Sequence, residues 1–153
     1  SRFEEGGYRC CNCEGQGPEL RIILDTNVFV SGVFFTGPPY QILKAWREGR
    51  VKLIVSPEIL EEYERVGKIL AEEFPSINLQ PILDFVTIKA EIIPAERLSE
   101  RVSDDPDDDK FLACAISANS KIVISGDRHL LKVSGFRGIK VMKPRPFVDD
   151  YLT

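Results

Sequence analysis

Four acidic side chains are spread along this sequence at positions that could bring them together in the fold. They are Asp25, Glu62, Asp108 and Asp127. Asp25 and Asp127 each follow an apolar run that is typical of a buried strand. Carboxylates at the C-terminal ends of parallel strands converge on one crevice, where they repel each other unless a hard cation lies between them. Mg²⁺ and Mn²⁺ prefer oxygen ligands and are therefore the expected occupants.

The elements that must position these acids alternate between apolar strands and amphipathic helices from Arg21 onward. The expected strands are residues 21–25, 51–55, 86–93, 121–125 and 139–142, and the expected helices are residues 40–48, 57–70, 79–85, 106–119 and 128–131. Ser56 and Pro57 suit the N-cap and first position of a helix. The alternation predicts an α/β fold with a parallel sheet covered by helices on both faces.

The expected helix at residues 57–70 carries four glutamates, which helical periodicity can separate. Its apolar stripe comprises Ile59, Tyr63, Val66 and Leu70. Glu61 and Glu64 fall on the opposite side and are expected in solvent. Glu62 lies at the edge of the stripe and can reach a site beside the sheet. An ordinary flanking charge also explains Glu62 if it is considered without the other three acids.

The most acidic stretch of the chain is residues 103–109. Asp105 suits the N-cap of the helix that follows, and acids in a first turn complement the helix dipole. Asp108 does not fit that account, because Phe111 and Leu112 place it on the inward face of the helix. A buried carboxylate is costly unless a cation or donor satisfies it. We therefore expect Asp108 to bind metal and Asp105 to assist as a cap, an outer ligand or both.

Short polar residues follow the first of the strand-end acids. Thr26 and Asn27 come directly after Asp25. Asp and Asn favour turns, which explains this segment and the one around Asp127 without any site. Hydroxyl and amide groups at a strand end also suit hydrogen bonds that orient metal-binding carboxylates. His129 is expected at the surface, with no evident partner for acid–base chemistry.

The composition is that of a globular domain. The chain has 153 residues, of which 43% are hydrophobic and 29% charged, enough for one domain with a core. Residues 1–19 lack periodicity and are expected to form an extension to a domain at residues 20–153. No apolar run has the length of a membrane helix, and residues 1–7 lack the apolar stretch of a signal peptide, so a cytoplasmic location is expected.

Three of the four cysteines lie in the expected extension. Cys10 and Cys13 have the spacing of half a zinc knuckle, with Cys11 between them, but no second pair follows. A complete zinc site within one chain is therefore not expected. Cys114 lies in an apolar segment and is interpreted as a small core residue.

Four segments resemble, in order, the motifs of PIN-domain ribonucleases. They are residues 23–31, 57–66, 105–112 and 124–131, which contain Asp25, Glu62, Asp108 and Asp127 respectively. Ser125 stands where this family has Thr or Ser, and Asp109 departs from the Asn common in the most similar branch. That branch comprises prokaryotic, VapC-like toxin components of toxin–antitoxin pairs. The similarity spans about residues 21–152.

The resemblance implies a three-layer α/β/α fold with a five-stranded parallel sheet of order 3-2-1-4-5. It also implies cleavage of single-stranded RNA with one or two Mg²⁺ or Mn²⁺ ions, held by the four acids and supported by Thr26, Asn27 and Ser125. Such ions lower the pKa of a bound water and stabilise the leaving oxygen. The family further implies an antitoxin partner and a homodimer. Lys110 and Arg128, with Lys68 and Arg65, could steer phosphates, although each also fits a solvated charge.

The sequence also allows other functions. A net charge of −4 argues against a strongly basic nucleic-acid surface. A phosphohydrolase of the haloacid-dehalogenase type also places an Asp after a central strand, but it needs a second Asp where this chain has Asn27. An inactive PIN scaffold that binds RNA or protein is a further alternative. A plain protein-interaction module could use Phe34, Phe35, Tyr40 and Trp46, which are expected instead in the core or a dimer seam.

Overall fold

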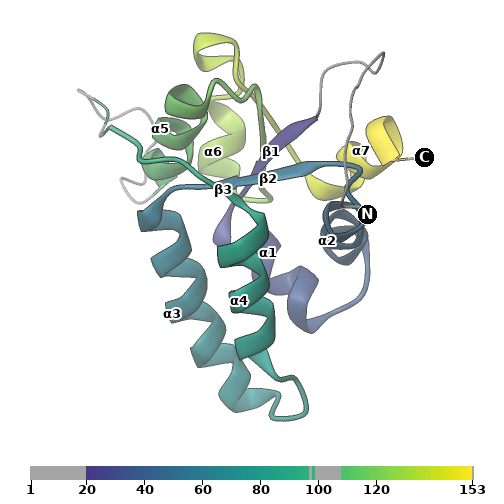
Figure 1. The fold of residues 1–153 in the computed structure, drawn as a ribbon. Helices are drawn as coiled ribbons and strands as arrows, with labels where there is room; N and C mark the ends of the chain where they lie inside the picture. Colours follow the sequence, from purple (N-terminus) through teal and green to yellow (C-terminus); the bar gives the residue numbers. More distant parts are fainter. Residues whose placement is uncertain (1–19, 97, 99–107, 153) are drawn as a thin grey trace.

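The computed structural model describes residues 20–96, 98 and 108–152. One parallel sheet of five strands, in the order β3-β2-β1-β4-β5, forms the centre of this part of the chain (Figure 1). The strands are β1 (Arg21–Leu24), β2 (Lys52–Val55), β3 (Glu91–Ile92), β4 (Ile122–Ile124) and β5 (Lys140–Met142). The α/β fold class and the strand order expected from the sequence are confirmed.

Helices flank both faces of the sheet. They are α1 (Thr26–Phe34), α2 (Pro38–Arg47), α3 (Pro57–Glu73), α4 (Leu79–Lys89), α5 (Asp109–Ala118), α6 (Arg128–Lys132) and α7 (Pro144–Phe147), with a 3₁₀ turn at Phe136–Gly138 and a π-helical turn at Val148–Leu152. In Figure 1, α5 and α6 lie on one side of the strands, and α1, α3 and α4 lie on the other. Within the described ranges, none of these helices is both long and apolar enough to cross a membrane.

The two central strands are apolar on both faces because helices cover both. Ile22 and Ile23 of β1 and Val123 and Ile124 of β4 have no exposed surface. Buried parallel strands have such continuous apolar sequences instead of alternating ones. The strands pair with Leu24 beside Ile124, so the residues that follow them leave the sheet at the same level.

A buried aromatic pair ties α1 and α3 to the end of β1. The rings of Phe29 and Tyr63 stack with their centroids 4.1 Å apart and their planes at 2°. The Tyr63 hydroxyl donates a hydrogen bond to the carbonyl oxygen of Leu24. Stacked pairs of this kind contribute about 0.5–1.5 kcal/mol beyond their buried area. The pair therefore fixes the start of α1 and the second turn of α3 relative to the strand end.

One expected strand was largely wrong, and one helix that follows β1 was not predicted. The strand expected at residues 86–93 is reduced to β3, because α4 continues to Lys89. Val86 is fully buried, and the Thr87 hydroxyl donates 3.0 Å to the carbonyl oxygen of Leu83. Packing and this hydrogen bond outweigh the β-propensity of both residues. Helix α1 was not predicted, since its many β-branched and aromatic residues resemble a continuing strand.

The bounds and caps of the remaining helices agree more closely with those expected from the sequence. Ser56 caps α3, its hydroxyl accepting a hydrogen bond of 3.3 Å from the amide of Ile59. That helix continues to Glu73, three residues beyond the expected end. Helix α5 is described from Asp109, whereas the expected cap Asp105 lies outside the described residues. The helical C-terminal segment at residues 144–152 was not predicted.

The expectations for the aromatic residues and Cys114 are only partly met. Trp46 and Phe34 are buried, whereas Phe35 and Tyr40 are exposed. Cys114 has no exposed surface, and burial raises the pKa of its thiol to about 12. The thiol therefore stays protonated and packs as a small core residue. Cys10, Cys11 and Cys13 lie outside the described residues.

A glycine allows the close approach of α1 and α2. A Cβ at Gly32 would lie 2.6 Å from Cδ1 of Leu43 and 2.8 Å from the carbonyl oxygen of Pro39. We expect Gly32→Ala to lower the free energy of unfolding by about 1–2 kcal/mol, because the overpacking outweighs the gain in helix propensity. Urea denaturation measures this change. Gly126→Ala is the control, since its Cβ would meet nothing within 4 Å; equal effects at both positions would contradict the packing argument.

Candidate functional site

Asp25 lies at the carboxyl end of β1 and caps α1. Its backbone amide still belongs to the sheet, donating 3.0 Å to the carbonyl oxygen of Ile124. Its Oδ1 accepts a hydrogen bond of 2.8 Å from the amide of Val28. Its Oδ2 accepts one from the hydroxyl of Ser125. The side chain is thus held by a helix N-terminus on one side and a neighbouring strand on the other.

Burial dominates the acid–base behaviour of Asp25. The residue is 4% exposed, and removal from water raises the pKa of its carboxyl from 3.8 to about 6. The hydrogen bonds from Ser125 and Val28 oppose this rise, while the charges of Asp127 and Glu62 add to it. A carboxyl that is so costly to ionise is stabilised in its charged form by a nearby cation.

Ser125 links the two strand-end acids. The residue is fully buried directly after β4, and its hydroxyl donates to Asp25. The same oxygen accepts a hydrogen bond of 2.9 Å from the backbone amide of Asp127. Asp127 caps α6, with its Oδ1 accepting 2.8 Å from the amide of His129. One hydroxyl therefore fixes the position of one acid and the backbone of the other.

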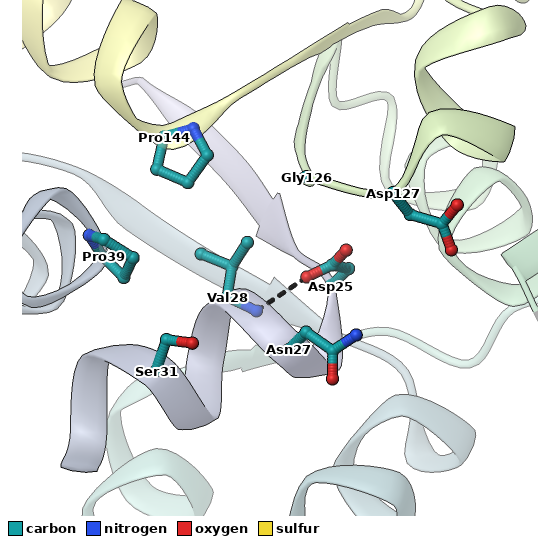
Figure 2. Close-up of a pocket in the computed structure, with 8 residues that line it drawn as sticks. All are labelled: Asp25, Asn27, Val28, Ser31, Pro39, Gly126, Asp127 and Pro144. Atoms are coloured by element: carbon teal, nitrogen blue, oxygen red, sulfur yellow. Dashed lines mark hydrogen bonds between the residues drawn. The ribbon is translucent and has the colours of Figure 1, made fainter. Parts of the chain in front are cut away.

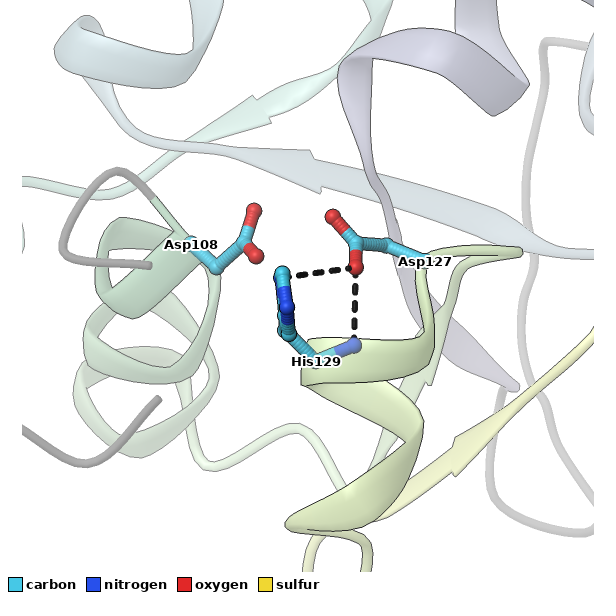
Figure 3. A group of neighbouring side chains, drawn as sticks. All are labelled: Asp108, Asp127 and His129. Carbon is cyan, nitrogen blue, oxygen red and sulfur yellow. Dashed lines mark hydrogen bonds and ion pairs between the residues drawn. The ribbon is translucent and has the colours of Figure 1, made fainter. Parts of the chain in front are cut away.

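Asp108, Asp127 and His129 form a compact group of possible metal ligands. One ligand atom from each lies within 4.8 Å of the others. Figure 3 shows the two carboxylates directed toward each other, with the imidazole beside them. Asp108 is 8% exposed, as its inward position on the helix predicts. Nδ1 of His129 lies 3.5 Å from Oδ1 of Asp127.

His129 is the residue that the sequence interpretation missed. It was expected at the surface without a partner, yet it is half-buried and contacts Asp127. A signal was present in the sequence, because a residue two positions after a helix N-cap lies in the first turn beside the capping carboxylate. No such rule brings it close to Asp108, which comes from another helix.

Glu62 is held by three side chains. The Thr26 hydroxyl donates to its Oε1. The ammonium of Lys110 lies 3.0 Å from its Oε2, and the guanidinium of Arg65 lies 3.5 Å from the same oxygen. The glutamate side chain is 16% exposed, in contrast with the exposed Glu61 on the neighbouring position. Glu62 thus reaches toward the sheet end, as its position at the edge of the apolar stripe predicts.

A pocket of about 400 Å³ adjoins the strand-end acids. Asp25, Asn27 and Asp127 lie at one end, and Pro39 and Pro144 lie at the other (Figure 2). The lining residues are Asp25, Asn27, Val28, Ser31, Pro39, Gly126, Asp127 and Pro144. The pocket thus combines negative charge with an apolar surface.

The remaining site residues expected from the sequence lie at the rim of the pocket, on the exposed surface or outside the described residues. Asn27 is exposed at the rim of the pocket, and Arg128 is exposed at the start of α6. Lys68 lies 3.6 Å from Glu64 on the exposed face of α3. Asp105 lies outside the described residues.

A comparison of the sequence with protein-family models identifies its family. A model described as a PIN domain matches residues 21–129, which include β1, β4 and all the acids described above. The chain belongs to the PIN-domain family. PIN domains are typically nucleases that act on nucleic acid and usually use divalent metals. Among curated proteins, no sequence matches this PIN domain.

The donor atoms of this PIN domain fit a divalent cation. Two carboxylates and an imidazole can each offer one atom at Asp108, Asp127 and His129, and the buried Asp25 shares Ser125 with Asp127. Carboxylate oxygens suit Mg²⁺ and Mn²⁺, whereas an imidazole suits transition metals better than Mg²⁺. The chemistry of the donors therefore agrees with the metal use that is usual in the family.

Proposed function

We propose that this PIN domain is a divalent-metal-dependent endoribonuclease that cleaves single-stranded RNA, and that it is the toxin of a toxin–antitoxin pair. The observation that carries the proposal is the close approach of Asp108, Asp127 and His129 beside the buried Asp25. The proposed assignment to the toxin branch of the family rests on the four sequence motifs that contain Asp25, Glu62, Asp108 and Asp127. We propose residues 20–153 as the nuclease domain, with residues 1–19 as an extension.

The proposed roles follow from the positions of the side chains. Asp25, Glu62, Asp108 and Asp127 supply the negative charge that holds one or two Mg²⁺ or Mn²⁺ ions, and the imidazole of His129 favours Mn²⁺. Such an ion supplies a water of lowered pKa and offsets the negative charge of a phosphate. Ser125 holds Asp25 in place, and Thr26 holds Glu62. Asn27 lies at the rim of the pocket, where a substrate would pass.

The pocket supports a single-stranded substrate. Its volume of about 400 Å³ is within the range of small-ligand sites and adjoins Asp25 and Asp127. An unstacked base could lie against Pro39 and Pro144 while its phosphate lies at the acidic end. Bases in a duplex are stacked and paired, and taking one out costs a few kcal/mol. Single strands avoid that cost, which favours them as substrates.

The proposal is tested by incubating labelled single-stranded RNA with the protein and Mn²⁺, Mg²⁺ or EDTA. We expect cleavage within the strand with either metal, more with Mn²⁺, and none with EDTA. Duplex RNA of the same sequence should be cut more slowly. A phosphomonoester assayed in parallel separates the phosphohydrolase alternative, which hydrolyses the ester and leaves the RNA intact. RNA that stays uncut under every metal condition would contradict the proposed activity.

The proposed partners come from the same branch of the family. An antitoxin would insert a segment near the acidic residues and block access to them, and the toxin would form a homodimer. Co-expression of the chain with the product of an adjacent gene, followed by purification, measures both associations. Cleavage that is unaffected by every such product would contradict the toxin role while leaving the nuclease role intact.

A further inference from the structure

Two cationic side chains and a hydroxyl lie against the carboxylate of Glu62. One oxygen accepts the Thr26 hydroxyl, and the other lies 3.0 Å from the Lys110 ammonium and 3.5 Å from the Arg65 guanidinium. An ammonium at 3.0 Å has the distance of a charge-assisted hydrogen bond. A divalent ion would have to displace that contact before it could bind the same oxygen.

Glu62 lies outside the group of possible ligands whose atoms are closest together. Among the residues that it describes, the group with ligand atoms within 4.8 Å of one another consists of Asp108, Asp127 and His129. Lys110 lies two residues after Asp108 in the first turn of α5. One helix end thus contributes a carboxylate to the ligand group and a cation to Glu62.

The position of Lys110 is well defined for a lysine. Its side chain is 20% exposed, and its ammonium lies 5.7 Å from the ring centroid of the buried Phe111. Partly buried charges are screened less by salt than exposed ones. A second divalent ion beside Glu62 would be repelled by the Lys110 ammonium and would meet an acid whose charge is already offset.

We propose that Lys110 takes the place of a second metal ion beside Glu62, so that this PIN domain binds one divalent ion, at the group formed by Asp108, Asp127 and His129. The inference rests on the proposed metal site and narrows it from one or two ions to one. Glu62 then acts as a positioning residue that links Thr26 to Lys110. The fixed positive charge of Lys110 also lies where it can attract a phosphate of the substrate.

The test is the number of Mn²⁺ ions bound per chain, measured by isothermal titration calorimetry and by the Mn²⁺ paramagnetic resonance signal of unbound ion. We expect about one ion for the wild type and about two for Lys110→Met, which keeps an unbranched side chain of similar length and removes its charge. Lys110→Arg keeps the charge and should bind one. Glu62→Gln in the Lys110→Met background should return the number to one.

The controls separate the possible failures. Lys44→Met changes an exposed lysine on α2 and should leave the number of ions unchanged. Circular dichroism melting in EDTA checks that each variant is folded. Two ions on the wild type, or one on a folded Lys110→Met protein, would overturn the role of Lys110 while leaving the metal site intact. A wild type that binds no Mn²⁺ would overturn both this inference and the metal dependence of the proposed nuclease.

Discussion

Asp108→Asn is expected to lower metal-dependent RNA cleavage by roughly 10²- to 10³-fold, a loss typical of removing one strong electrostatic contact from an active site. Asp108 is 8% exposed, and one of its oxygens lies within 4.8 Å of ligand atoms of Asp127 and His129. The amide keeps the shape of the side chain but removes a negative charge that a cation requires. Initial rates of cleavage of labelled RNA with saturating Mn²⁺ measure the effect.

The neighbouring residue provides a matched control for this variant. Asp109→Asn makes the same chemical change one position later, at the start of α5 and about 100° around the helix. It should keep cleavage close to that of the wild type. If both variants lose activity equally, the effect comes from the charge of the helix end and not from a ligand at Asp108. If Asp108→Asn keeps full activity, Asp108 is not in the site.

Asp25→Asn is expected to raise the free energy of unfolding at pH 7 in EDTA by about 1–3 kcal/mol. Burial raises the pKa of Asp25 from 3.8 to about 6, and a shift of that size corresponds to about 3 kcal/mol at 1.36 kcal/mol per unit. An amide does not have to ionise, and it can still accept the hydrogen bond from Val28. The Ser125 hydroxyl must reorient, which keeps the gain below the full value.

The sign of the pH dependence follows from the raised pKa. Between about pH 3.8 and 6 the folded protein holds a proton on Asp25 that the unfolded chain has released. The contribution of Asp25 to the free energy of unfolding is therefore largest below this pH range. It decreases as the pH rises through the range and is constant above it. Urea denaturation of the wild type in EDTA should show this decrease, and Asp25→Asn should lack it.

Adding Mn²⁺ should make the wild type more stable than Asp25→Asn, which reverses the order expected in EDTA. An ion that binds only the folded state stabilises it in proportion to the logarithm of its concentration over Kd. The wild type should gain this stabilisation with Mn²⁺, and Asp25→Asn should gain less. Asp150→Asn, an exposed acid in the C-terminal turn, is the control and should follow the wild type in both conditions. An equal pH dependence of stability for the wild type and Asp25→Asn between pH 4 and 6 would contradict the raised pKa of the buried carboxyl.

Local rules explain why much of the fold could be predicted. The apolar runs around Ile23 and Val123 are short and rich in β-branched residues, which favours strands buried on both faces. Ser56 and Pro57 are a start signal for α3 that needs no tertiary contact. The apolar residues Phe111 and Leu112 place Asp108 inward by helical geometry alone. Each of these inferences depends on neighbours within about four residues.

Where local preference and packing disagreed, the sequence was misleading. Residues 86–89 are rich in β-branched side chains, and a strand was expected there; residues 26–34 are rich in β-branched and aromatic side chains, and no helix was expected there. Asp25 instead starts a helix by capping it, and Val86 is buried by the packing of α4 on the rest of the fold. The hydrogen bonds of those helices are local, but the burial that stabilises them comes from packing against residues that are distant in the sequence.

The sequence by itself predicted the alternation of strands and helices, the Ser56 cap of α3 and the inward direction of Asp108, because these depend on periodicity and short-range hydrogen bonds. Only the tertiary structure decided which side chains meet. The register of β1 and β4 brings Ser125 to Asp25, and the packing of α5 beside α6 brings Asp108 to His129. The packing of α3 against α5 gives Glu62 the ammonium of Lys110 as its partner. Contacts between separate elements depend on strand register and helix packing, which no local pattern specifies.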